Sequence, residues 1–92
     1  VSKWGTDAAG DEGFYSPHSV AVASDGSVYI ADTGYDRIQK LTPEGEFVSK
    51  WGTEGDGAGQ FQSPISIAVA PDGSVYVADT GNDRIQKFLP GP

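Results

Sequence analysis

Short runs of apolar and β-branched residues alternate with turn residues along the chain, and no stretch keeps the 3.6-residue period of an amphipathic helix. In the first half of the chain these runs cover residues 19–23, 27–31, 37–41 and 47–51. Strands of about five residues, separated by turn signals roughly every 8–12 residues, predict an all-β fold.

The runs differ in ways that predict their places in a sheet. Residues 19–23 are small and apolar with little polar alternation, so we expect this strand to be innermost and buried on both faces. Residues 37–41 alternate with a period of two, which is typical of a half-buried strand. Lys50 in the fourth run, and its copy Lys3, suit an outer edge, because charge there discourages pairing with other chains.

The segments between the runs carry recognisable turn chemistry. Asp25-Gly26 predicts a tight hairpin, because Asp accepts a hydrogen bond from the backbone two residues on and Gly tolerates a positive φ. Pro43-Glu44-Gly45 predicts a second turn, with proline at its first central position.

The whole pattern is written twice, with a period of 47 residues and no insertion. Aligning residues 1–45 with residues 48–92 gives 29 identities at 45 positions. Four short strands in a period of about 40 to 50 residues are typical of one propeller blade. We therefore expect one domain, residues 1–92, composed of repeat 1 (1–47) and repeat 2 (48–92), with two four-stranded antiparallel blades.

Residues 52–63 predict the link that crosses from the rim of one blade to the centre of the next, and their glycines suit a flexible connector. Within this link, Glu54-Gly55-Asp56-Gly57 lacks the spacing of a calcium or phosphate loop. Aromatic residues recur at the repeat spacing and are predicted to pack between blades. They are Phe14, Phe61, Trp4 and Trp51.

With these residues in place, the chain resembles the NHL-repeat β-propellers. The resemblance is carried by Phe61-Gln62-Ser63-Pro64, by the run from Asp72 to Asn82, and by Arg84-Ile85-Gln86-Lys87-Phe88, each with a counterpart 47 residues earlier. It implies a ring of six blades. It also implies a binding platform for proteins or RNA, a sensor ectodomain or, in one branch of the family, a metal-dependent lyase.

The phase of the repeat predicts assembly. Residues 1–4 repeat the fourth strand of a blade, whereas residues 84–88 repeat a third strand. We expect residues 1–4 of one chain to complete the C-terminal blade of its neighbour, since head-to-tail contacts of this kind close into rings. Two blades per chain allow four, six or eight blades, and the family's preference makes a homotrimer with six blades our prediction.

Composition narrows the possible partners. The formal net charge is −7, with 6 Lys and Arg against 13 Asp and Glu, which argues against nucleic acid and anionic membranes as partners. There is no cysteine, no signal peptide pattern and no apolar run long enough to span a membrane, and the compartment stays open. The high identity of the repeats and the absence of methionine favour a designed or excerpted propeller.

Asp-Thr-Gly occurs at residues 32–34 and 79–81 and matches the tripeptide of aspartic proteases. We reject that chemistry, because it requires two carboxylates that share a proton, and both copies occupy the same hairpin position of a repeated blade. Instead we expect Asp32 and Asp79 to cap their turns and to face Arg37 and Arg84 across the hairpin, in pairs that contribute little if they are exposed.

Two unrepeated residues are further candidates. His18 has Ile65 as its counterpart, so three chains would place three His18 side chains at one end of the central channel, a possible zinc site with an open position. Tyr35 lies in a predicted turn and is a candidate contact surface.

The sequence therefore predicts a non-enzymatic, self-assembling β-propeller that acts as a structural or binding scaffold and needs no cofactor. Two alternatives stay open. One is a protein-interaction platform that binds a ligand at the channel mouth, and the other is a metal-dependent lyase or hydrolase with a ring of His18.

Overall fold

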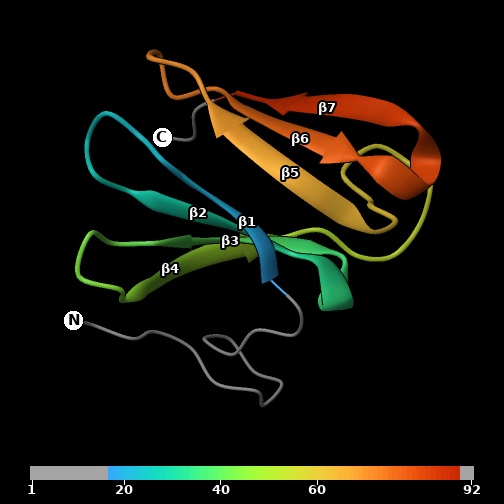
Figure 1. The fold of residues 1–92 in the computed structure, drawn as a ribbon, viewed down its shortest axis with the longest axis horizontal. Helices are drawn as coiled ribbons and strands as arrows, with labels where there is room; N and C mark the ends of the chain where they lie inside the picture. Colours follow the sequence, from blue (N-terminus) through green and yellow to red (C-terminus); the bar gives the residue numbers. More distant parts are fainter. Residues whose placement is uncertain (1–16, 90–92) are drawn as a thin grey trace.

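The computed structural model describes residues 17–89, which form two antiparallel sheets. The first sheet has four strands in chain order: β1 (Pro17–Val22), β2 (Val28–Asp32), β3 (Arg37–Leu41) and β4 (Phe47–Trp51). The second has three: β5 (Pro64–Val69), β6 (Val75–Asp79) and β7 (Arg84–Phe88). Figure 1 shows the two sheets stacked face to face, joined by the link between β4 and β5.

The all-β prediction is confirmed, because residues 17–89 contain no α-helix. The only helical segments there are two single-turn 3-10 helices, η1 (Thr33–Tyr35) and η2 (Thr80–Asn82), where the sequence predicted plain turns. Each ends at an aspartate in the left-handed conformation, Asp36 with φ 54° and Asp83 with φ 53°. No helix in this part of the chain is long and apolar enough to cross a membrane.

The predicted Asp-Gly hairpins are confirmed. Gly26 and Gly73 have φ values of 91° and 92°, which favour glycine. The Asp25 carboxylate accepts a hydrogen bond from the Ser27 N–H at 2.8 Å. This bond holds the pKa of Asp25 below its ordinary value, and Ser74 acts in the same way on the pKa of Asp72.

Alternation along the strands decides what lies between the sheets. Tyr29 and Ala31 of β2 face the second sheet, whereas Val28 and Ile30 face the opposite way. The core cluster joins residues of both sheets and of the link. Its buried members are Tyr29, Ala31, Ile38, Phe61, Ile67, Val75 and Val77.

The prediction that β1 is buried on both faces is wrong for the single chain. Ser19 and Ala21 are partly buried, but Val20 and Val22 are 61% and 64% exposed. The reason is that the second sheet covers only one face of the first, and within residues 17–89 no further sheet packs against the other.

The first sheet has the four strands predicted for a blade. The second has three among the described residues, as expected for a blade whose outer strand was predicted to come from a neighbouring chain. The strand predicted at residues 1–4 lies outside the described residues, as do Trp4 and Phe14. The ring therefore remains a prediction.

Candidate functional site

A buried carboxylate at the end of β6 organises one end of the second sheet. Asp79 is 0% exposed and accepts hydrogen bonds from the Arg84 Nε and the Asn82 Nδ2, both at 2.9 Å. Its other oxygen accepts the Gln62 N–H at 2.7 Å, and the Gln86 Nε2 lies at 3.3 Å. Since the donors come from β7, from η2 and from the link, the carboxylate is held on several sides.

Arg84 carries this network into the link between the sheets. Its two terminal nitrogens donate to the backbone carbonyls of Asp56, Gly57 and Gln60 at 2.7 to 2.9 Å. The Gln86 side-chain amide makes two further hydrogen bonds with the same link. Its oxygen accepts from the Gly59 N–H, and its nitrogen donates to the Gln60 carbonyl. The expectation of a flexible connector at residues 52–63 is therefore wrong, because Arg84 and Gln86 anchor the link through its backbone at several points.

Asp32 occupies the equivalent position in the first sheet. It is 0% exposed and lies 2.9 Å from the Arg37 Nε, with the Gln39 Nε2 at 3.4 Å. The sequence predicted that both carboxylates cap their turns and face the arginines across the hairpin. Both ion pairs form and both carboxylates are buried, but neither carboxylate caps the backbone of the turn that follows it. By alternation, Asp79 shares the face of Val75 and Val77, which lies against the first sheet, whereas Asp32 shares the opposite-facing side of β2 with Val28 and Ile30.

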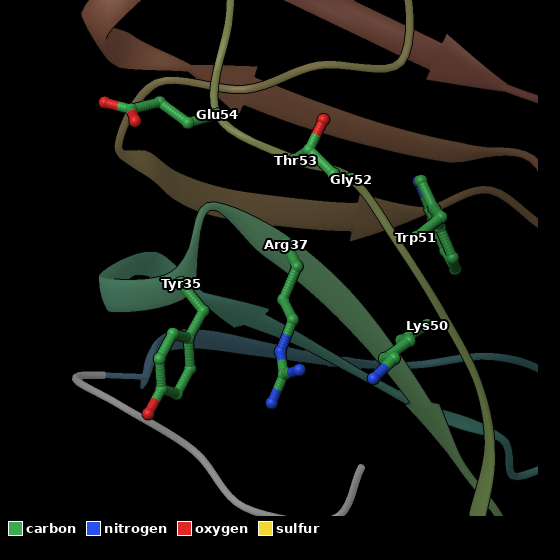
Figure 2. Close-up of a pocket in the computed structure, with 7 residues that line it drawn as sticks. All are labelled: Tyr35, Arg37, Lys50, Trp51, Gly52, Thr53 and Glu54. Atoms are coloured by element: carbon green, nitrogen blue, oxygen red, sulfur yellow. The ribbon is translucent and has the colours of Figure 1, made fainter. Parts of the chain in front are cut away.

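An open hollow of about 540 Å³ lies at the outer end of the first sheet. Its lining is Tyr35, Arg37, Lys50, Trp51, Gly52, Thr53 and Glu54. Figure 2 shows Tyr35 and Arg37 extending in the same direction from neighbouring parts of η1 and β3. The Arg37 guanidinium lies 4.8 Å from the Tyr35 ring centre, so this tyrosine packs against the arginine as well as facing solvent.

His18 lies on β1 and is exposed. Within residues 17–89, His, Asp and Glu side chains form no group of three that would hold a metal ion. A ring of three His18 side chains requires three chains, so the zinc site remains a prediction.

The aromatic residues predicted between blades occupy one continuous layer where they are described. Phe61 is 0% exposed, and its ring centre lies 5.8 Å from that of Phe88. Trp51 contacts both Phe88, at 5.5 Å, and Tyr29, at 6.2 Å. Phe61 thus sits where the link, β7 and the first sheet meet.

The two sheets differ in which face is covered. On the first sheet, Tyr29 and Ile38 face the second sheet and are 8% and 0% exposed. Their counterparts on the second sheet, Tyr76 and Ile85, are 37% and 66% exposed. On the other face the difference lies in the inner strand: Ile67 of β5 is 7% exposed and its counterpart Val20 is 61% exposed, whereas Val28 and Ile30 of β2 are 7% and 9% exposed. The described residues therefore expose apolar side chains along β1 and on the outer face of the second sheet, and the counterparts of both sets lie between the two sheets.

Three polar contacts join the sheets at the same interface. The Thr33 hydroxyl donates to the Pro64 carbonyl, and the Ser63 N–H donates to the Asp36 carboxylate at 2.8 Å. The Ile67 N–H lies 3.3 Å from the Ser19 hydroxyl, which accepts its hydrogen bond. Each of the three side chains on the first sheet has an identical counterpart on the second, 47 residues later.

Sequence reasoning missed the glutamines, Gln39 and Gln86, and the roles of Thr33 and Asp36. Their signal was present, since all four residues are identical in both repeats although none is apolar. A polar residue kept in both copies needs a partner, but which one is decided by the stacking of the sheets.

The buried carboxylate predicts a pH dependence. Burial alone raises the pKa of Asp79, but hydrogen bonds from the Gln62 N–H, Asn82, Arg84 and Gln86 outweigh it and hold that pKa below 3.8. Since the pKa is lower in the folded state, the stabilisation is complete well above 3.8 and is lost as the pH falls through the folded-state value.

We therefore expect the free-energy difference between the wild type and Asp79→Asn to shrink as the pH is lowered from neutral toward about 3. Urea unfolding of both proteins across this range, at one chain concentration, measures it. A difference that stays constant or grows toward low pH would contradict the assignment.

Comparison with known proteins gives one family. The family model of the NHL repeat matches the chain twice, at residues 14–41 and 61–88. Together the two segments cover more than half of the 92 residues and include six of the seven described strands. No curated protein matches the chain.

Proposed function

Because the chain belongs to the NHL-repeat family, we propose that it is a non-enzymatic β-propeller module that assembles from copies of itself and serves as a structural or binding scaffold. Three chains close a six-bladed ring in this proposal. Each chain contributes the two sheets of Figure 1 as consecutive blades. The identity of the two repeats supports an origin in recent duplication or deliberate symmetrisation.

The observation that carries the proposal is that two exposed apolar patches, one along β1 and one on the outer face of the second sheet, have counterparts that meet inside the chain. One end of the chain exposes Val20 and Val22, whose counterparts Ile67 and Val69 lie against the first sheet. The other end exposes Tyr76 and Ile85, whose counterparts are buried. Two copies of the chain can stack in the same way as the two sheets stack within one chain, with the second sheet of one copy against the first sheet of the next. This contact buries both exposed patches. It is heterologous, and its repetition closes a ring when the rotation permits.

Energetics favours covering these faces. Burial of apolar surface contributes roughly 25 cal/mol per Å², so a few hundred Å² at each end amounts to several kcal/mol. That is a large part of the stability of a small domain. An isolated chain would leave this surface in water, and a domain of this size has little other core to offset it.

The edge of β7 supports the same arrangement. β7 pairs with β6 on one side only, and no described strand pairs with its other edge. In the first sheet the equivalent edge, on β3, is paired with β4. Residues 1–4 repeat the sequence of residues 48–51 in β4. In our proposal, residues 1–4 of a neighbouring chain supply the missing outer strand.

Charge and side-chain chemistry support a scaffold. The net charge of −7 disfavours nucleic acid and anionic membranes as partners. The two Asp-Thr-Gly aspartates each bind an arginine 2.9 Å away, which leaves neither carboxylate as one half of a shared-proton pair. A protein ligand at the channel mouth is compatible with the ring and would add to the scaffold role.

The mass in solution tests the proposal. The chain has a mass of 9.6 kDa, so three chains give about 29 kDa. We expect light scattering on a sizing column, or native mass spectrometry, to find this species at micromolar concentrations. A species of about 38 kDa would replace the six-bladed ring by eight blades, and a compact, folded species of one chain would overturn assembly altogether.

A further inference from the structure

Within the chain, residues 61–64 lead into the second sheet and contact the first sheet at three neighbouring positions. Phe61 is buried in the core cluster together with Tyr29, Ala31 and Ile38 of the first sheet. The Ser63 N–H donates to the Asp36 carboxylate, and the Pro64 carbonyl accepts from the Thr33 hydroxyl. Pro64 itself is among the fully buried side chains.

The surface on the first sheet that binds this segment, formed by Thr33, Asp36 and the apolar face beside them, is called here the receptor. The second sheet carries an equivalent receptor, and no described residue is bound to it. Thr80 and Asp83 stand where Thr33 and Asp36 stand, on a 3-10 turn with nearly the same geometry, and both are exposed. Between the strands behind them is a shallow apolar hollow of about 140 Å³. Its lining is Ser66, Ile67, Ala68, Tyr76, Ala78 and Ile85.

The sequence also carries a second docking segment. Phe14-Tyr15-Ser16-Pro17 repeats Phe61-Gln62-Ser63-Pro64 at the phenylalanine, the serine and the proline. These are the three residues whose ring, N–H and carbonyl make the contacts in the first copy. Pro17 is exposed at the start of β1, whereas Pro64 is buried at the start of β5.

The segment and the receptor of one chain do not fit each other. A docking segment leads directly into the sheet that stacks on its receptor, as residues 61–64 lead into β5. Residues 14–17 lead into β1, and the first sheet already stacks on the opposite face of the second. Among the described sheets, only the first sheet of another chain can stack on the outer face of the second sheet.

We propose that residues 14–17 of a second copy of this chain dock on the second sheet, with Phe14 in the hollow beside Tyr76, Ala78 and Ile85. The Thr80 hydroxyl donates to the Pro17 carbonyl of that copy, and the Asp83 carboxylate accepts its Ser16 N–H. This inference rests on the proposed self-assembly and names the residues that set its register. The apolar faces supply attraction, and the two polar contacts hold the partner at one position on the sheet.

Asp83→Gly tests the polar contact. Glycine adopts the left-handed φ of 53° at this position without strain, so the substitution removes the carboxylate while keeping the turn. Hydrogen bonds to a charged group are stronger than neutral ones. We expect the chain concentration at half-assembly to rise about tenfold or more, measured by sedimentation or light scattering over a dilution series.

Asp36→Gly is the matched control, because it removes the equivalent bond inside the chain. Asp36→Gly should lower the thermal stability of the chain and leave the chain concentration at half-assembly close to that of the wild type. Ala78→Trp is a second test, since a bulky side chain there fills the hollow from within and should also block assembly. Far-UV circular dichroism at low concentration shows whether each variant keeps its sheets.

The outcomes separate this inference from the proposed function. A wild type that assembles, together with Asp83→Gly and Ala78→Trp variants that assemble at the wild-type concentration, would overturn the docking of residues 14–17 and leave the ring intact. A wild type that stays a single chain at all concentrations would overturn both. Selective loss of assembly in the two variants, with Asp36→Gly still assembling, supports the docking.

Discussion

Replacement of Phe61 by alanine is expected to lower the free energy of unfolding by about 3 to 5 kcal/mol. The side chain is 0% exposed, contacts residues of both sheets and lies 5.8 Å from the Phe88 ring. It also packs on the backbone of Gly52, where even one added methyl carbon would come within 2.6 Å of the ring. Alanine therefore leaves a cavity at the junction of the link and both sheets, which cannot collapse without shifting one sheet on the other.

Urea unfolding at a fixed chain concentration measures this effect, since assembly makes the apparent stability depend on concentration. Leu89→Ala is the control. Leu89 follows β7 directly and is 75% exposed, so removal of its side chain should cost a few tenths of a kcal/mol. If Phe61→Ala cost no more than Leu89→Ala, the junction would not be the core of the chain.

Replacement of Arg84 by methionine is the second large effect, with an expected loss of about 3 kcal/mol. The change leaves the Asp79 carboxylate, 0% exposed, without its ion-pair partner at 2.9 Å. It also removes the donors to the carbonyls of Asp56, Gly57 and Gln60. We place the loss at the low end for a buried pair, because 30% of the Arg84 side chain is exposed to solvent.

Lys87→Met is the matched control for Arg84→Met. Lys87 lies on the same strand and is exposed, with its ammonium 5.5 Å from the Tyr76 ring. We expect a change of about 1 kcal/mol or less. Hydrogen exchange of the link provides a second measurement: the amides of residues 55–61 should lose protection in Arg84→Met and keep it in Lys87→Met. Equal losses of stability in the two variants would show that Arg84 acts as an ordinary surface cation.

The two predictions concern neighbouring parts of one junction. Phe61 supplies the apolar contact between link and sheets, and Arg84 anchors the same link through its backbone. Since residues 14–17 repeat residues 61–64 at three of four positions, the junction inside the chain also describes the contact proposed between chains.

Much of the fold follows from local pattern. All seven described strands lie within two residues of the four runs identified from their apolar and β-branched residues, or of the copies of those runs 47 residues later, because a strand's alternation is a property of its own sequence. The Asp-Gly hairpins also follow locally, since Asp25 bonds the backbone only two residues away. The 47-residue period predicted two blade-like units, and two NHL-repeat matches bear this out.

The site was predicted less well than the fold. The pairs Asp32–Arg37 and Asp79–Arg84 were identified from their positions across a hairpin, but their burial was not. A hairpin places the two side chains side by side whether or not anything covers them. For Asp79 the first sheet lies against the same face, and neither the strand pattern nor the turn chemistry says how the two sheets stack.

The sequence by itself determined the strands, the turns, the repeat and the family, because each depends on residues close together in the chain or on direct comparison of its two halves. Only the tertiary structure decided that the link is anchored by Arg84, that Val20 is exposed while its counterpart Ile67 is buried, and that Thr33 and Asp36 join the sheets. The physical reason is that identical repeats have identical local preferences. Burial depends on what lies against each face, and stacking one sheet on the other gives the two copies different neighbours.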